Sequence, residues 1–435
     1  MNTLQREFDK QYKKLMKPNK IGALVIAKRC RSANINLSES QIESIESQLR
    51  DSADGHLSID ISDEQWSSAG FASEADAAEA LNRALQDLVP EIKLFASNLD
   101  HSLPELLSET TEHLALSTLK TLKRTARGML RDRRSIHLAF EANLYYIWGK
   151  ALDALETHLA VALEAGEIFN HEFRNAAARS NNVVFEVLTR SHARSCQIAS
   201  EVLSLLLAGH ADGAMARWRS LHELSVVCSF IKKHGNEVAE RYLLHQSIES
   251  CKAAAQYQEY CDRIGQMSFT AEEIADMKEN KEILIKRFGK AYGTEYGWAA
   301  EILMSRQPRF SDIEKSVDLD HLRPYYRMAS HKVHANPRGV FFSLGLSHGT
   351  EKILLAGPSN AGLADPGHLT AISLTQVTAN LLTTEPNLDR LVMCNILLKM
   401  SDEVGEKFWA ADRRLKMMER RTKRLTRTRR KRRAR

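Results

Sequence analysis

The sequence has few of the residues that interrupt helices. Its 435 residues include only 20 glycines and 9 prolines, which is below their combined share in average proteins. No long stretch is dominated by β-branched or aromatic residues, and this argues against a β-sandwich or a propeller. The hydrophobic content of 43% excludes disorder of the whole chain. We therefore expect a mostly α-helical protein with more than one folding unit.

Cysteine patterns and catalytic signatures are also scarce. The six cysteines are scattered without a CxxC spacing, so the sequence predicts neither a disulfide framework nor a zinc site made of cysteines. The chain has no Walker-type phosphate loop, no dinucleotide fingerprint after a strand and no GxSxG elbow. The histidines near residue 330 do not reproduce the HExxH spacing of zinc-binding helices. We expect no metal and no cofactor.

Long apolar runs are absent as well. The longest, Val202 to Ala208, is far shorter than the roughly 18 residues that a membrane span needs. The N-terminal residues are polar and basic, without an apolar run of secretory length. We therefore predict no membrane partner and expect a cytoplasmic protein with reduced thiols.

Charge is distributed unevenly along the chain. The net charge is +6, but residues 413–435 hold 14 Lys and Arg against the single acid Glu419, so the rest of the chain is net acidic. Together with the hydrophobic periodicity and the turn signals, this asymmetry predicts six segments. These are a basic amphipathic helix (1–33), a small acidic helical module (34–103), a central helical bundle (104–338), a short β-hairpin (339–356), C-terminal helices (357–412) and a basic arm (413–435).

Turn signals are sparse within the predicted bundle, so we expect its helices to follow one another in antiparallel order. A break is predicted at Gly166, and the short Gly209–Gly213 connection predicts a helical hairpin. Further helices are expected near 292–305 and 319–335. From Gly339 onward the pattern changes to short apolar runs around a turn, and this change predicts the β-hairpin.

One helix of the bundle, residues 214–234, is apolar on almost every side and yet carries Arg217, Arg219 and Glu223. Charges on a buried helix are costly unless they are paired or used. Arg219 and Glu223 stand one turn apart on the same face, where they would form a structural ion pair. The alternative is that the three side chains line a polar cavity that binds a substrate.

A second group of candidates lies on the predicted helix near residue 330. Arg327, His331 and His334 project from one face of that helix. An Arg can bind two phosphate oxygens, and a His that titrates near neutral pH can exchange a proton with a ribose 2′-hydroxyl or with the leaving oxygen. The neighbouring Tyr325 and Tyr326 could stack on bases. The plainer alternative is that both histidines are hydrogen-bonded structural residues.

Two resemblances rest on these segments. The R-S-L-H-E run at residues 219–223 and the later Ser330-x-x-x-His334 spacing resemble a bacterial domain family of unknown function over about residues 190–345. The spacing from Arg327 to His334 also resembles the Rx4–6H signature of HEPN ribonucleases. That resemblance implies a HEPN-like helical bundle that dimerises and cuts RNA without a metal, with Arg327 holding the phosphate and His334 acting as the acid or base.

The functional hypothesis combines this site with the arm. We expect a metal-independent endoribonuclease of HEPN-like type, of the toxin or phage-defence kind, with Arg327 and His334 catalytic and His331 assisting. The alternative is a non-catalytic RNA- or ribosome-associated protein that binds RNA, or another polyanion, through the arm. The residues of the arm that we expect to contact phosphates are Arg420, Arg421, Lys423, Arg424, Arg427, Arg429, Arg430, Lys431, Arg432 and Arg433.

Overall fold

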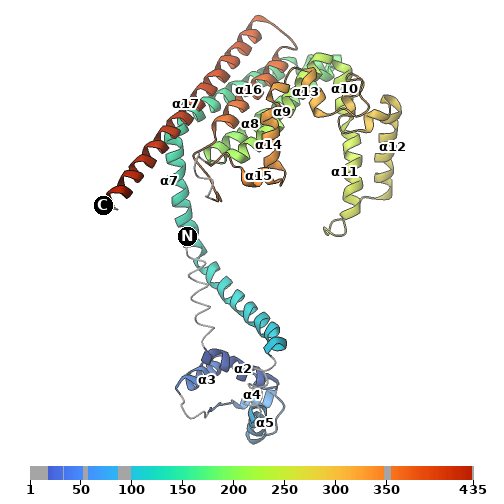
Figure 1. Cartoon of the computed structure of the whole chain (residues 1–435). Coiled ribbons are helices and arrows are strands. Elements are labelled where there is room, and N and C mark those ends of the chain that lie inside the picture. The colour runs from blue at the N-terminus through green and yellow to red at the C-terminus, as the bar shows by residue number, and fades with distance from the viewer. Residues whose placement is uncertain (1–17, 33, 52–56, 87–98, 347–353, 434–435) are drawn as a thin grey trace. The chain divides into compact units, whose positions relative to one another are not determined.

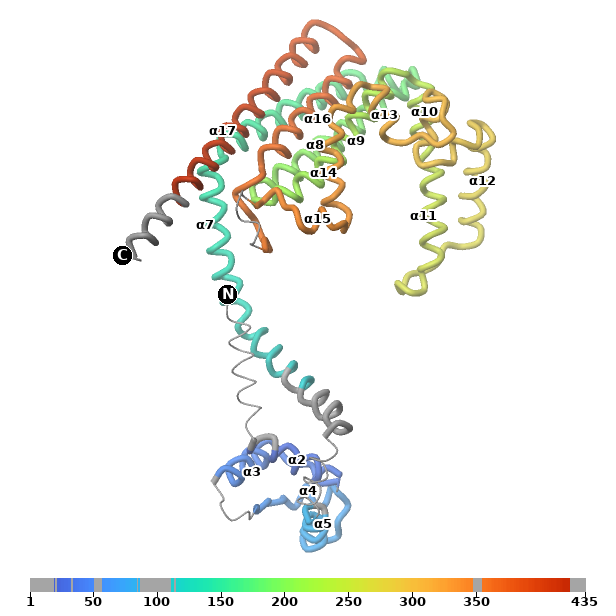
Figure 2. Tube along the Cα trace, in the orientation of Figure 1, coloured from blue at the N-terminus to red at the C-terminus, as the bar shows by residue number. Residues whose placement is uncertain are grey.

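Helices make up most of the described protein (Figures 1 and 2). The computed structural model describes residues 18–32, 34–51, 57–86, 99–346 and 354–433. The chain divides into two compact units, Met1–His137 and Leu138–Arg435. Within the described ranges there is no β-strand, and none of the helices combines the length and the apolar character that crossing a membrane requires. The expectation of a mostly α-helical protein is confirmed.

The described part of the N-terminal unit holds short helices around a small core. They are α2 (Pro18–Ser32), α3 (Glu39–Asp51), α4 (Asp63–Ser68) and α5 (Glu74–Gln86). Ile26 and Cys30 of α2 are buried in one cluster with Ile45 of α3 and Leu81 of α5. Helix α2 therefore shares its core with the acidic segment that follows it. Most of the basic helix predicted for residues 1–33 lies outside the described residues.

Helix α7 (Leu99–Ser180) is continuous over 82 residues. The break predicted at Gly166 is wrong, because this glycine serves packing instead. A Cβ at Gly166 would lie 2.2 Å from Cε1 of His192 on α8 (Val183–Leu207). The buried His192 ring thus packs directly on the α7 backbone, and the helix continues past the glycine at the cost of its low helix propensity.

The core of the C-terminal unit lies between long helices. α8 and α9 (Ala211–His234) form the predicted helical hairpin, which packs against α16 (Ala364–Leu382). Helix α16 in turn packs against α17 (Leu388–Arg433) (Figure 1). The second half of α7 joins the same apolar cluster, in which Trp148 of α7 contacts Phe408 of α17 with ring centroids 5.9 Å apart. These helices form the framework that carries the shorter elements.

Shorter elements connect α9 to α16. They are α10 (Asn236–Leu244), α11 (Gln246–Tyr260), α12 (Ala271–Phe288), η1 (Lys290–Gly293), η2 (Gly297–Ala299), α13 (Phe310–Ser316), η3 (Asp320–Leu322), α14 (Arg323–Val333) and α15 (Pro337–Phe341). The helix predicted near 292–305 is wrong: this stretch consists of the short 3₁₀ turns η1 and η2 and further turns. The turns allow Tyr292 and Trp298 to be buried together in a second apolar cluster. In a regular α-helix, residues six positions apart would lie on different faces.

The predicted β-hairpin (339–356) is not confirmed. Val340 and Phe341 belong to helix α15, and residues 342–346 and 354–356 form no regular element. Residues 347–353, the expected turn, lie outside the described residues. Helix α15 forms because Asn336 caps it: its side chain accepts a hydrogen bond from the N–H of Gly339, and Pro337 fits the first turn.

Helix α16 carries a row of buried polar side chains. Thr375 Oγ1 lies 2.8 Å from His158 Nε2, and Thr378 Oγ1 lies 3.2 Å from His192 Nε2. Burial lowers the pKa of both histidines to about 4. Both rings are therefore neutral near pH 7 and act as hydrogen-bonding parts of the core.

Candidate functional site

Helix α14 carries the predicted catalytic residues Arg327 and His331 and ends next to His334. It begins at Arg323, accommodates Pro324 in its first turn and ends at Val333. Arg327 and His331 lie one turn apart on it. His334 is the C-cap residue: its backbone is extended, and its N–H still donates to the carbonyl of Ser330, 3.1 Å away. The helix is thus shorter at both ends than the predicted 319–335.

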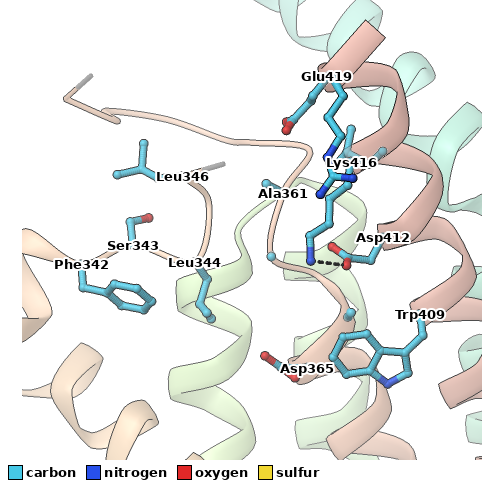
Figure 3. Close-up of a pocket in the computed structure, with 14 residues that line it drawn as sticks. Phe342, Ser343, Leu344, Leu346, Ala361, Asp365, Trp409, Asp412, Lys416 and Glu419 are labelled. Carbon is cyan, nitrogen blue, oxygen red and sulfur yellow. Dashed lines mark ion pairs between the residues drawn. The ribbon is translucent and has the colours of Figure 1, made fainter. Parts of the chain in front are cut away.

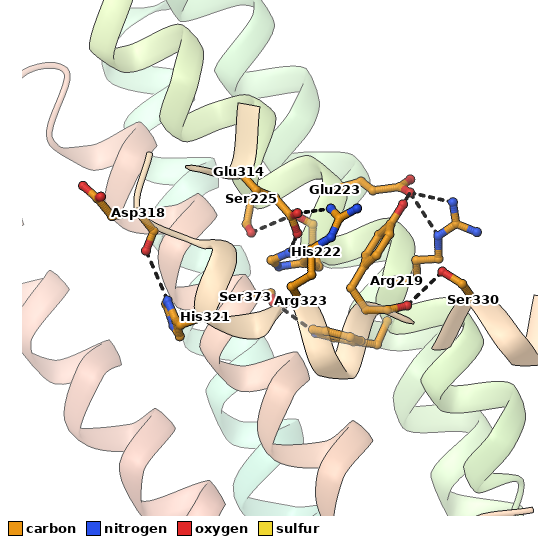
Figure 4. A network of polar contacts seen from close by, with 12 residues as sticks. Arg219, His222, Glu223, Ser225, Glu314, Asp318, His321, Arg323, Ser330 and Ser373 are labelled. Atoms are coloured by element: carbon orange, nitrogen blue, oxygen red, sulfur yellow. Dashed lines mark hydrogen bonds and ion pairs between the residues drawn. The ribbon is translucent and has the colours of Figure 1, made fainter. Parts of the chain in front are cut away.

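A polar network joins α14 to α9 (Figure 4). The hydroxyl of Tyr326 donates to Glu223 Oε1 at 2.6 Å, and Arg219 Nε donates to the same oxygen at 3.1 Å. The guanidinium of Arg219 also lies 4.9 Å from the centroid of the Tyr326 ring. Burial and the bond to Glu223 raise the pKa of Tyr326 well above its ordinary value, so its hydroxyl stays a donor at neutral pH. The predicted Arg219–Glu223 ion pair is present.

Next to this network lies a fully buried acid that the sequence did not single out. Glu314 of α13 accepts from His222 Nε2 at 2.9 Å and pairs through its other oxygen with Arg323 (Figure 4). Both Glu314 and His222 are completely buried. No periodic signal marks Glu314, because its partners are 92 and 9 residues away in the chain and only folding brings them together. The group ties α13, α9 and α14 into one unit.

Arg327 and His331 line a groove of about 510 Å³. We call it the α14 groove; its other lining residues are Pro324, Met328, Lys332, Arg338 and Phe342. None of these described lining residues is acidic. Arg327 and Arg338 are exposed, and the side chain of neither has a hydrogen-bond or ion-pair partner among the residues that the structure describes. The groove therefore has two arginines free to bind an anion.

The imidazole of His331 is held in a defined orientation. Asn336 Nδ2 lies 2.8 Å from His331 Nδ1, while the Oδ1 atom of the same amide accepts from the N–H of Gly339. Because the amide oxygen is occupied, the amide nitrogen donates to Nδ1, and the neutral ring carries its proton on Nε2. His331 can thus donate from Nε2 to a bound oxygen.

Lys332 fixes the groove to the rest of the unit. Its side chain is only 6% exposed, and Nζ lies 3.0 Å from Asp212 Oδ1 near the start of α9. Nζ also donates to the carbonyl of Phe342, and the backbone N–H of Leu344 donates to Asp212 at 3.0 Å. The charge of Lys332 is therefore used for structure, and it holds the segment after α15 against α9.

The remaining predicted residues do not join the α14 groove. Arg217 pairs with Glu201 of α8, and Tyr325 packs on the main apolar cluster. His334 is exposed but does not line the groove. Within the described residues, no hydrogen bond or ion pair links Arg327 or His334 to Arg219 or Glu223. The structure thus separates the candidates into a structural network and an open groove.

Comparison with known protein families finds a match, and it covers the region of the site. Residues 185–351 match DUF5677, a family of unknown function. The match confirms the predicted resemblance, and the DUF5677 region contains both the Tyr326 network and the α14 groove. No curated protein and no solved structure matches the chain. The HEPN resemblance receives no support from these comparisons.

The start of the basic arm follows the DUF5677 region on α17. Arg420 and Arg421 are exposed there. The side chains of the other predicted arm residues, Lys423, Arg424, Arg427, Arg429, Arg430, Lys431, Arg432 and Arg433, lie outside the described residues. No group of three His, Cys, Asp or Glu in the described part could hold a metal ion.

A larger cavity of about 540 Å³ adjoins the arm (Figure 3). Asp365, Asp412 and Glu419 line it together with Lys416 and Arg420. Lys416 pairs with Asp412 at 2.7 Å, and burial together with the Asp412 carboxylate raises the pKa of Asp365. Three carboxylates against two cations make this cavity unfavourable for a phosphate. The α14 groove is the better candidate for an anionic ligand.

Proposed function

We propose that this protein binds RNA, with phosphates held in the α14 groove and the C-terminal arm supplying further contacts. The observation that carries the proposal is the pair of unpartnered arginines, Arg327 and Arg338, in a groove without an acidic residue among its described lining. A guanidinium without an acidic neighbour keeps its full capacity for two hydrogen bonds to a phosphate.

The arm adds charge without sequence preference. Fourteen Lys and Arg between residues 413 and 435 bind a phosphate chain mainly by releasing its counterions. The arm therefore raises the rate of encounter, and the groove fixes one position of the chain.

Binding of a labelled single-stranded RNA, followed by fluorescence anisotropy, tests the proposal. The double variant Arg327→Ala/Arg338→Ala is expected to bind about tenfold more weakly, since two phosphate contacts are lost. The double variant Arg179→Ala/Arg306→Ala removes the same charge from two other exposed sites and is expected to bind almost as the wild type does. Equal losses in both double variants would contradict a specific role of the groove.

A second candidate function, cleavage of RNA, is favoured by one further observation: His331, with its proton on Nε2, lines the groove beside Arg327. In this hypothesis Arg327 holds the phosphate and His334 accepts the proton of the 2′-hydroxyl as that oxygen bonds to phosphorus. His331 donates a hydrogen bond from Nε2 to the 5′ oxygen as its bond to phosphorus breaks. This oxygen takes a proton from water, and the protonated His334 returns its proton to the hydroxide left behind, so the products are a cyclic phosphate and a free 5′-hydroxyl.

Incubation of the protein with RNA in the presence of EDTA tests the cleavage hypothesis. His331→Ala and His334→Ala are each expected to reduce cleavage at least about a hundredfold, while both variants still bind RNA. If the wild type binds RNA without cutting it, or if both variants cut like the wild type, cleavage at this site is excluded and RNA binding remains.

A further inference from the structure

A second groove, lined by aromatic and basic side chains, lies between α7 and α17. Its volume is about 400 Å³, and we call it the tyrosine groove. Its lining residues include Tyr145, Tyr146 and Lys150 of α7 and Lys407 and Arg414 of α17. The two helices pack side by side here through Trp148 and Phe408 (Figure 2). Tyr145 and Tyr146 are 50% and 66% exposed, so both rings are open to a ligand.

Both rings are held in place before any ligand binds. The hydroxyl of Tyr145 donates to Asp153 Oδ1 at 2.6 Å, and its ring lies against Gly149, where a Cβ would be 3.1 Å from Cε1. The guanidinium of Arg414 lies 4.8 Å from the centroid of the Tyr146 ring. Rings that are already fixed lose little conformational entropy when a flat ligand stacks on them.

The charges around the rings favour an anionic ligand. Lys150 has no ion-pair partner among the described residues, and within that same part of the chain Arg414 interacts only with the Tyr146 ring. The acid in the lining, Asp153, already accepts from Tyr145. Arg421 follows Arg414 by two turns on the same face of α17, so the groove leads directly into the basic arm.

We propose that the tyrosine groove binds single-stranded RNA by stacking bases on Tyr145 and Tyr146 while Lys150 and Arg414 contact the flanking phosphates. This inference rests on the proposed RNA binding and adds a preference: a duplex hides the faces of its bases, so the groove selects unpaired nucleotides. Aromatic platforms with nearby cations are the general means by which proteins hold single strands without reading their sequence.

The test compares two oligomers of equal length and charge, an oligouridine and an abasic analogue, each binding to the full-length protein. Tyr146→Ala is expected to weaken oligouridine binding about tenfold and to leave the abasic oligomer unaffected, because only the first can stack. Tyr146→Trp is expected to restore the affinity. The matched control is Tyr260→Ala: Tyr260 is also exposed, at 40%, and lies under an arginine, Arg263, at 5.7 Å.

Each other outcome overturns the inference. Equal weakening for both oligomers means that Tyr146 does not stack on bases, and equal effects of Tyr146→Ala and Tyr260→Ala mean that the site is not specific. If Tyr146→Ala changes only the oligomeric state, measured by sedimentation, the groove is an interface between copies of the chain. If the wild type binds oligouridine but Tyr146→Ala is silent, only this inference fails; if the wild type binds no RNA, the proposed function fails with it.

Discussion

The hydroxyl of Tyr326 connects two helices, since it donates to the carboxylate that Arg219 already neutralises. Tyr326→Phe removes this bond and leaves the half-buried Glu223 with one partner fewer. We expect the free energy of unfolding to fall by about 1–2 kcal/mol. Urea denaturation measures this free energy. The control Tyr257→Phe removes an exposed hydrogen bond to the Met267 carbonyl and should lower the free energy of unfolding by less than about 0.5 kcal/mol. Equal losses would show that the Tyr326 hydroxyl has no special role.

Two buried histidines make stability depend on pH. The pKa of His158 and of His192 is lowered to about 4 in the folded state, while it is about 6.5 in the unfolded chain. The unfolded state therefore binds more protons below neutrality, so stability is full above about pH 6.5 and falls as the pH drops toward 4. At about pH 5, each histidine should lower the free energy of unfolding by about 2 kcal/mol relative to its value at neutral pH.

The variant His158→Gln separates this effect from the other titrating groups. Glutamine retains a donor for Thr375 but does not titrate, so the loss of melting temperature on acidification should be smaller than in the wild type. The exposed His171 offers the control, since His171→Gln should leave the acid dependence unchanged. An unchanged acid dependence in His158→Gln would contradict a neutral, buried His158.

At the level of single residues, only local pairs could be predicted from the sequence. The Arg219–Glu223 pair was accessible because both residues belong to one helix at a spacing of four. The partners of Arg217 and Glu314 were not, because they lie on other helices and depend on how those helices pack. The same limit applies to Asp212, which pairs with Lys332 from another helix, 120 positions earlier in the chain.

Among the elements, the junction of α14 and α15 is the most constrained by its sequence. Pro337 disfavours a helical backbone at Asn336, and Asn336 caps the next helix, so α14 must end before it. Pro337 predicted the end of α14 from the sequence alone. The role of Asn336 as the cap of a following helix was not predicted, because the apolar runs in residues 339–356 are typical of strands. The backbone of α15 packs closely against the end of α14 at Gly339, where a Cβ would lie 1.8 Å from the carbonyl oxygen of His331.

Gly339→Ala tests this junction. The added methyl group would overlap with backbone rather than with a flexible side chain, so α15 has to move away from α14. We expect a loss of about 1–3 kcal/mol in the free energy of unfolding and weaker RNA binding, since Arg338 moves with α15. Gly357→Ala is the control, because a methyl group added there would meet nothing within 4 Å in the described structure. A Gly339→Ala protein with wild-type stability and binding would show that the junction is not tightly packed.

For the whole molecule, the distribution of charge matters more than its total. Deleting residues 423–435 removes nine Lys and Arg from a chain with a net charge of +6. We expect weaker binding to every RNA tested, without a change in preference, because the arm contacts phosphates only. A filter-binding series with several RNAs measures these affinities. If the deletion variant also loses the preference of the wild type for one RNA sequence over another, the arm takes part in base recognition.

If Arg327 and Arg338 contact RNA phosphates in the α14 groove, both side chains contribute to the salt dependence of RNA binding. Each phosphate contact on a single strand contributes about 0.7 to the slope of log affinity against log salt concentration. We expect Arg327→Ala/Arg338→Ala to lower the magnitude of this slope by about 1.4, twice that contribution, and Arg179→Ala/Arg306→Ala to leave it near the wild-type value. An unchanged slope in the first double variant would show that these two arginines do not contact phosphates, even if the affinity of that variant were reduced.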